Sequence, residues 1–205
     1  MQRSWNWRIL QVIARIFTTV WFNFKTYGRE NVPATGGVLL LSNHQSYLDP
    51  VLVAVQLKRP VSFMARSSLF KNPFFARFIR SLNAFPVRLG RGDVSAIKEC
   101  VRQLEEGKAL NVYPEGTRTL TGEIGPIEKG IALVIRRAGV PVVPVAIDGS
   151  FEAWPKGKIL FHPHQIRLIY GKPMLLHELG GDEIVLRLEQ ALSGLLVELR
   201  HMRAK

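Results

Sequence analysis

Short apolar runs alternate with amphipathic stretches along most of the chain, and this alternation limits the fold more than any other feature of the sequence. The runs at 38–41, 61–65, 85–87, 109–113, 142–147 and 166–170 have the composition of strands. Helical spacing or capping residues mark the stretches 49–57, 69–82, 93–106, 130–138 and 182 onward. The alternation predicts an α/β fold with a mixed, largely parallel sheet sandwiched by helices.

The first 26 residues form a separate amphipathic segment in front of this domain, which we expect to span residues 27–205. Apolar side chains recur at helical spacing at Trp5, Ile9, Ile13, Phe17, Val20 and Phe24. The longest charge-free run, 16–24, is much shorter than the roughly 20 residues that span a bilayer. The pattern favours a helix in the membrane interface, with its apolar face and Trp5, Trp7 and Trp21 in lipid, and Arg8 and Arg15 near headgroups. The alternative is a helix packed on the domain or on a second copy of it.

The chain is strongly basic, with 28 Lys and Arg against 16 Asp and Glu and a formal net charge of +12. Such a charge favours a polyanionic partner: nucleic acid, an anionic membrane surface or a phosphorylated substrate. No helix-turn-helix, zinc-finger or aromatic RNA-binding signature is present in the sequence, so nucleic acid is not an expected partner. The single cysteine, Cys100, excludes an intramolecular disulfide, and we expect it in the core.

Two polar clusters directly follow predicted strands, where α/β folds place their functional sites. The first is Asn43 to Pro50. In one straight helix, His44 and Asp49 would point about 140° apart. If His44 lies in a loop and Asp49 caps the next helix, the chain can curl back and bring the carboxylate to the imidazole, which makes a general base. The alternative is that Asp49 is only a helix cap and His44 an ordinary loop residue.

The second cluster, Tyr113 to Thr119, contains residue types that suit a phosphate. Arg118 offers a planar fork of donors, and Gly116 lets the backbone approach a ligand closely. Glu115 is expected to orient that guanidinium or to bind substrate hydroxyls. The alternative is a strand-ending turn with a surface ion pair. Ser42 and Ser46 lie in no nucleophile elbow, so we expect the base to activate a substrate hydroxyl directly.

Four sequence blocks stand in order: Asn43-His44 with Asp49, Phe85-Pro86-Val87-Arg88, Tyr113 to Arg118, and Val140 to Val145. Together they resemble the glycerolipid acyltransferase family, and within it the bacterial-type 1-acylglycerol-3-phosphate acyltransferases. The resemblance covers roughly residues 27 to 175. The second block departs from the pattern because it lacks the family's usual aspartate before the arginine.

The resemblance implies transfer of a fatty acyl group from acyl-CoA or acyl-carrier protein to the sn-2 hydroxyl of lysophosphatidic acid, in one step without an acyl-enzyme. His44 would be the base and Asp49 its partner. The acceptor phosphate would be bound by Arg88, Glu115, Gly116 and Arg118, with support from Asn43, Ser46, Thr117, Lys129 and Pro144, the last on the acyl-donor side. No metal or other cofactor is expected. The alternatives are another lysolipid acceptor, such as a lyso-ornithine lipid, and a non-catalytic basic membrane-binding module.

A basic aromatic stretch mixes rings with cations at Lys71, Phe74, Phe75, Arg77, Phe78 and Arg80. This composition suits a membrane-facing flap or the rim of an acyl channel. The alternative is an amphipathic helix with Phe74 and Phe78 in the core. His162 and His164 are not expected to bind a metal, because no third ligand is in view. We expect a peripheral or monotopic protein on the cytoplasmic face of the inner (cell) membrane, where acyl donors are made.

Overall fold

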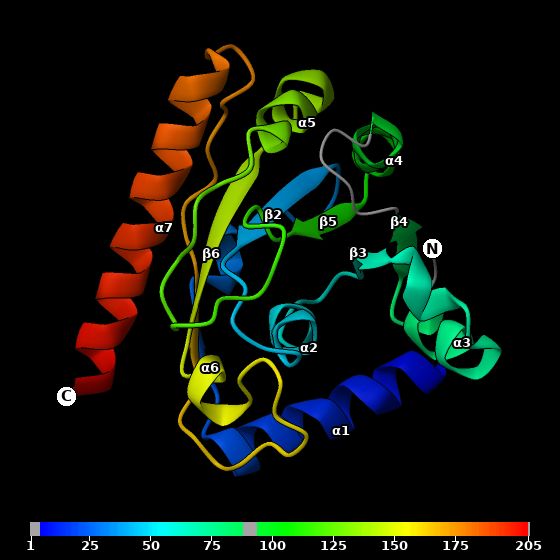
Figure 1. The fold of residues 1–205 in the computed structure, drawn as a ribbon, viewed down its shortest axis with the longest axis vertical. Helices are drawn as coiled ribbons and strands as arrows, with labels where there is room; N and C mark the ends of the chain where they lie inside the picture. Colours follow the sequence, from blue (N-terminus) through cyan, green and yellow to red (C-terminus); the bar gives the residue numbers. More distant parts are fainter. Residues whose placement is uncertain (1–4, 88–93, 205) are drawn as a thin grey trace.

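The sheet organises the protein, and a computed structural model describes it over residues 5–87 and 94–204, with side chains from residue 9 to residue 203 within those ranges. The strands are β1 (Lys25–Tyr27), β2 (Val38–Ser42), β3 (Val61–Arg66), β4 (Ala84–Val87), β5 (Ala109–Val112), β6 (Val142–Asp148) and β7 (Arg167–Tyr170). Across the described ranges they form one seven-stranded sheet of order β1-β7-β6-β2-β5-β3-β4 (Figure 1). Neighbouring strands are parallel except β6 and β7, which confirms the mixed, largely parallel sheet.

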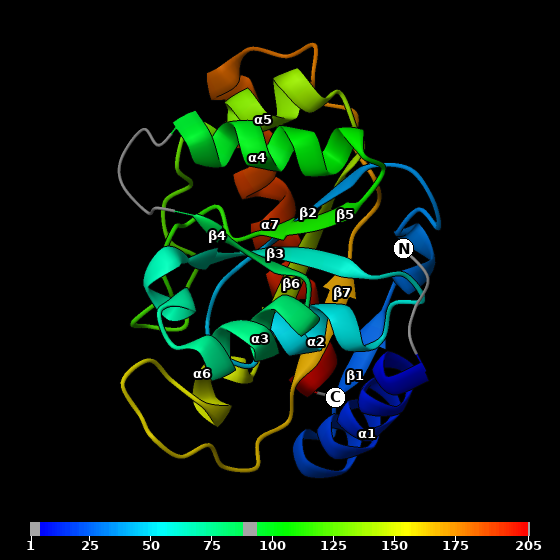
Figure 2. The same ribbon diagram turned by 90° about the vertical axis from the view of Figure 1, so that its right-hand side faces the viewer.

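Helices cover both faces of this sheet. They are α1 (Trp5–Phe22), α2 (Asp49–Val55), α3 (Pro73–Ser81), α4 (Val94–Glu105), α5 (Gly130–Ala138), α6 (Ser150–Ala153) and α7 (Gly181–Ala204), with short 3₁₀ turns at Arg29–Asn31 and Ser67–Phe70. Helices α4, α5 and α7 pack on one face, and α2 and α6 pack on the other, with α1 against α2 (Figures 1 and 2). The predicted three-layer arrangement is therefore present.

Strand β2 is the centre of the sheet and is buried along its whole length. Val38 and Leu40 point into the core beneath α2, whereas Leu39 and Leu41 point into the core beneath α4, α5 and α7. A strand that is covered on both faces has no side facing solvent. Its sequence is therefore a continuous apolar run and not an alternation of apolar and polar residues. All six predicted strands lie within one residue of the observed bounds, and Cys100 is buried as expected.

Helix α1 differs from its prediction at its C-terminal end. It ends at Phe22, because Asn23 adopts a left-handed conformation with φ of 43°. Phe24 is then buried in the core, and residues 25–27 form the edge strand β1 on β7. The sequence analysis predicted no strand here and placed residues 25 and 26 inside the amphipathic segment.

Helix α1 is docked on the domain and still exposes apolar side chains. Gln11 Nε2 donates to the carbonyls of Val55 (3.0 Å) and Leu57 (2.9 Å), and Arg15 Nε donates to Val55 O at 2.6 Å. Arg15 therefore contacts the C-terminal end of α2. Ile9, Ile13, Phe17, Val20 and Trp21 remain exposed. Among helices of the described residues, none combines the length and apolar character that a membrane span requires.

The burial of β2 predicts the cost of truncating its side chains. Leu40→Ala should lower the free energy of unfolding by about 3 kcal/mol, because it leaves a cavity in a packed core. Leu186→Ala, on the exposed side of α7, is the matched control and should change it by no more than about 0.5 kcal/mol. Urea denaturation of both variants measures the difference, and equal losses would contradict the assigned core.

Candidate active site

The two predicted clusters meet at one edge of the sheet. Strands β2 and β5 are parallel neighbours, so the loops after their carboxyl ends start side by side. His44 lies in the first loop, and its Nδ1 is 2.8 Å from Asp49 Oδ2. The predicted contact between imidazole and carboxylate is confirmed. Helix α2 begins at Asp49 and its N-cap is Leu48, so the prediction of Asp49 as N-cap was wrong by one position. The helix ends at Val55, two residues before the predicted Leu57.

The Asp49 carboxylate is fully buried and accepts four hydrogen bonds. Its Oδ2 accepts from His44 Nδ1 and from the backbone amides of Gln45 and Ser46, each of the latter at 2.7 Å. Its Oδ1 accepts from Ser150 Oγ at 2.7 Å. These bonds explain the missing cap, because the carboxylate is turned toward the preceding loop. A carboxylate accepts only, so Nδ1 donates its proton and Nε2 keeps a lone pair.

Three further contacts hold the His44 ring and backbone. The ring stacks on Tyr113, with centroids 3.8 Å apart and planes at 16°. The His44 amide donates to Glu115 Oε1 at 2.7 Å, and its carbonyl accepts from the Thr119 amide at 2.8 Å. The side chain is 19% exposed, so the imidazole is fixed in position but open to a ligand.

Glu115 contacts backbone amides through both of its carboxylate oxygens. Oε1 accepts from the His44 amide, and Oε2 accepts from the Gly125 amide at 2.7 Å. Burial raises the pKa of this carboxyl group, and the two amide donors partly oppose that shift. The sequence analysis expected Glu115 to face a guanidinium or a substrate; these bonds indicate a side chain that positions the His44 loop.

Arg118 presents an unpaired donor. Its guanidinium carbon lies 3.5 Å from the centroid of the Tyr47 ring. Its Nη1 is buried and has no hydrogen-bond partner among the described groups. A buried guanidinium N–H without a partner is costly, and an anion would satisfy it.

The two residues before Arg118 have separate roles in the loop. Gly116 has φ of +67°, which L side chains rarely adopt. Thr117 Oγ1 accepts from Lys156 Nζ at 3.2 Å.

The remaining predicted residues fall into three groups. Asn43 and Ser46 lie at the site: Asn43 pairs both its amide atoms with the backbone of Ile147, and Ser46 Oγ donates to Trp154 O at 2.9 Å. Lys129 is exposed and pairs with Asp182, and Pro144 lies inside β6, where its carbonyl accepts from the Gly171 amide.

Arg88 lies outside the described residues, as do the side chains of Trp5, Trp7 and Arg8.

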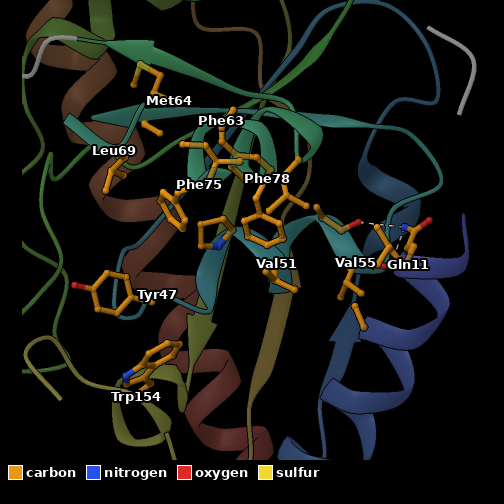
Figure 3. Close-up of a pocket in the computed structure, with 18 residues that line it drawn as sticks. Gln11, Tyr47, Val51, Val55, Phe63, Met64, Leu69, Phe75, Phe78 and Trp154 are labelled. Carbon is orange, nitrogen blue, oxygen red and sulfur yellow. Dashed lines mark hydrogen bonds between the residues drawn. The ribbon is translucent and has the colours of Figure 1, made fainter. Parts of the chain in front are cut away.

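An apolar cavity of about 510 Å³ lies between α1, α2, α3, β3 and β4. Figure 3 shows Tyr47 and Trp154 at one end, Phe75 and Phe78 in the middle, and Gln11 at the other end. The buried residues of α3 are Ala76 and Ile79. Phe78 is exposed and Phe74 is 86% exposed, so the alternative that placed both in the core was wrong. Lys71, Arg77 and Arg80 are exposed as well.

The sequence analysis missed Ser150, Tyr47 and Trp154. Ser150 follows β6, which is parallel to β2 and ends at the same edge, so the rule that singled out the two clusters also applied here. Tyr47 stood inside the first cluster without a role. Within the part of the chain that the structure describes, no group of three or more His, Cys, Asp or Glu side chains could hold a metal ion.

The imidazole of His44 and the guanidinium of Arg118 lie in the loops that follow β2 and β5, at the carboxyl edge of an α/β sheet, and comparison with known proteins assigns a chain with this fold to the acyltransferase class of enzymes. The chain belongs to the acyltransferase family, whose model matches residues 23–148. The 1-acyl-sn-glycerol-3-phosphate acyltransferase of Bacillus subtilis is 31% identical over 183 residues, covering 86% of this chain and 88% of the relative. The Pseudomonas aeruginosa protein of the same name is 28% identical, covering 82% of this chain and 65% of its own.

A solved structure agrees with these matches. The crystal structure of the 1-acyl-sn-glycerophosphate acyltransferase PlsC from Thermotoga maritima has a TM-score of 0.80 with this fold. The two chains are 28% identical, and the match covers 94% of this chain and 79% of that one. The predicted family and the predicted fold are both confirmed.

The contacts of Glu115 predict the effect of replacing its carboxylate by an amide. In Glu115→Gln, the new NH₂ group must face one of two backbone N–H donors, which leaves a buried amide unpaired. We expect the free energy of unfolding to fall by about 1–3 kcal/mol, measured by urea denaturation. Glu178→Gln, at an exposed position, is the control and should change little. Equal stability of the two variants would refute the positioning role of Glu115.

Proposed function

We propose that the protein transfers a fatty acyl group from an acyl thioester to the sn-2 hydroxyl of lysophosphatidic acid, which gives phosphatidic acid. The observation that carries this proposal is the orientation of the His44 imidazole, which Asp49 holds through Nδ1 so that Nε2 is free. Arg118, whose Nη1 is a hydrogen-bond donor without a partner, lies in the neighbouring loop. Relatives that match most of the chain are named 1-acyl-sn-glycerol-3-phosphate acyltransferases, which supports the same acceptor.

In the proposed mechanism, His44 is a general base. Nε2 takes the proton of the acceptor hydroxyl as that oxygen attacks the thioester carbonyl carbon. The tetrahedral intermediate then expels the thiolate, which takes the proton back from the imidazolium and leaves as a thiol. Asp49 holds the ring and stabilises the imidazolium through Nδ1–H. The acyl group passes directly from the thioester to the acceptor hydroxyl, with no acyl-enzyme and no cofactor.

Arg118 is the proposed ligand of the acceptor phosphate. Its guanidinium lies over the Tyr47 ring, and its buried Nη1 has no hydrogen-bond partner among the described groups. The amide of the next residue, Thr119, binds the His44 carbonyl, so the phosphate ligand and the base are tied to one another. A phosphate on Arg118 would fix the acceptor, and with it the distance from its hydroxyl to Nε2.

The apolar cavity is the proposed site of a fatty acyl chain. It is lined almost wholly by apolar side chains, and its Tyr47 end lies next to Arg118. Each buried methylene is worth about 0.8 kcal/mol, so a cavity of fixed volume sets a chain-length preference. The basic surface suits both candidate donors, acyl-CoA and acyl-carrier protein, because both carry phosphate.

The exposed apolar face of α1 supports a peripheral attachment to the membrane. Ile9, Ile13, Phe17 and Val20 are exposed on a helix that is docked on the domain. In the interface these side chains would reach the acyl layer while the domain stays in water. We place this surface on the cytoplasmic side of the cell membrane.

Acyl transfer by purified protein tests the proposed function. With lysophosphatidic acid and either acyl-CoA or acyl-carrier protein, wild type should form phosphatidic acid. His44→Ala should lose about a thousandfold in turnover, because the base is removed. His201→Ala, exposed on α7, is the matched control and should keep wild-type turnover. Undiminished turnover of His44→Ala would remove His44 from the mechanism.

The phosphate-binding role of Arg118 predicts a change in the acceptor constant. Arg118→Ala should raise KM for lysophosphatidic acid about tenfold or more, with a small change in KM for the thioester. Arg137→Ala, at an exposed position of α5, is the control and should leave both constants unchanged. A lower kcat with an unchanged acceptor KM would indicate transition-state work instead. If wild type acylated phosphate-free lysolipids as fast as lysophosphatidic acid, the assignment of Arg118 to the acceptor phosphate would be wrong.

A further inference from the structure

The segment between α6 and β7 exposes two large apolar side chains at its tip. Ile159 is 89% exposed and Leu160 is 80% exposed. The hydrophobic effect disfavours such exposure unless another surface covers the side chains. In both ribbon views this segment lies at the same end of the molecule as α1 (Figures 1 and 2).

Defined contacts hold this segment in shape. Trp154 Nε1 donates to Lys158 O at 2.9 Å, and the His162 amide donates to Ala153 O at 3.0 Å. The Phe161 ring lies 6.0 Å from Phe17 and 6.2 Å from Trp21, both on α1. The tip is therefore continuous with the exposed apolar face of α1.

The charge around the tip favours an anionic partner. Lys156 and Lys158 precede the tip and are exposed, and the chain contains no Asp or Glu between residues 153 and 177. Lysines next to apolar side chains suit the headgroup level of an anionic lipid layer. A second copy of this chain would bring the same positive charges to the contact, which is unfavourable.

A chain of aromatic contacts connects the tip to the candidate active site. Phe161 lies 5.5 Å from Trp154, and Trp154 lies 5.2 Å from Tyr47. Tyr47 in turn carries the Arg118 guanidinium on its ring. Two rings thus separate the base of the tip from the residue that we assign to the acceptor phosphate.

We propose that residues 155–161 form a second membrane contact, which inserts Ile159 and Leu160 into an anionic lipid layer beside α1 and sets Arg118 at the headgroup level. This inference rests on the proposed function for the role of Arg118, but not for the lipid contact itself. With two contacts instead of one, the protein cannot rotate about the axis of α1. A lysolipid phosphate then reaches Arg118 while its acyl chain stays in the layer.

The test compares a tip variant with a matched control. Ile159→Ser with Leu160→Ser alters the tip, and Leu133→Ser with Leu186→Ser alters exposed apolar residues of α5 and the N-terminal half of α7, at the opposite end in Figure 1. Sedimentation with vesicles of phosphatidylglycerol and phosphatidylcholine measures partitioning. The tip variant should partition about tenfold or more weakly than wild type, and the control should partition equally well. Thermal unfolding checks that both variants are folded.

Two further measurements separate the inference from the proposed function. Lys158→Gln should weaken binding to the anionic vesicles about fivefold and leave binding to pure phosphatidylcholine vesicles unchanged. The tip variant should lose turnover on lysophosphatidic acid embedded in vesicles, and should keep it on a short-chain, monomeric lysophosphatidic acid. An inactive wild type would defeat the proposed function and leave the partitioning result standing.

Three outcomes would overturn the inference. The first is wild-type partitioning of the tip variant, and the second is an equal loss in the control. The third is a change in the oligomeric state of the tip variant, seen by light scattering, with vesicle binding retained; a second copy would then be the partner of the tip.

Discussion

The buried carboxylate of Asp49 is the constraint on which the rest of the candidate site depends. A charge without solvent is stable only if hydrogen-bond donors surround it, and here the imidazole, two backbone amides and the Ser150 hydroxyl supply them. Each donor comes from a segment that must therefore take up one conformation. The loop from His44 to Ser46 folds back over the start of α2 for this reason, and the orientation of the imidazole follows from it.

Tyr47 joins the polar and apolar parts of the protein. One face of its ring receives the Arg118 guanidinium, and the residue also lines the apolar cavity. A cation over an aromatic ring is stabilised by the ring's electrons, while the ring remains an apolar surface for its other neighbours. A ligand with an anionic head and a hydrocarbon tail meets both kinds of surface within the width of one side chain, which fits the amphiphilic acceptor that we propose.

The sequence predicted those parts of the structure that local composition determines. The buried strands could be located because burial on both faces leaves a run of apolar residues, as in β2. Strand β1 was missed because Lys25, Thr26 and Tyr27 have no such pattern and pair only through the distant β7. The His44–Asp49 contact spans five residues and was accessible to reasoning about spacing. The amide partners of Glu115 and the Ser150 contact were not, because residues 44, 115, 125 and 150 meet only after the sheet has formed.

The bonds around His44 also set an order of events during protein synthesis. Strands β2, β5 and β6 each contribute to the imidazole's surroundings, through Asn43, Glu115 and Ser150 respectively. A nascent chain that has left the ribosome only as far as β5 holds His44 and Asp49 but lacks the Ser150 donor and the Ile147 backbone that anchors Asn43. The full set of contacts around the base therefore requires residues 147 and 150, which the ribosome adds last among the segments that surround His44.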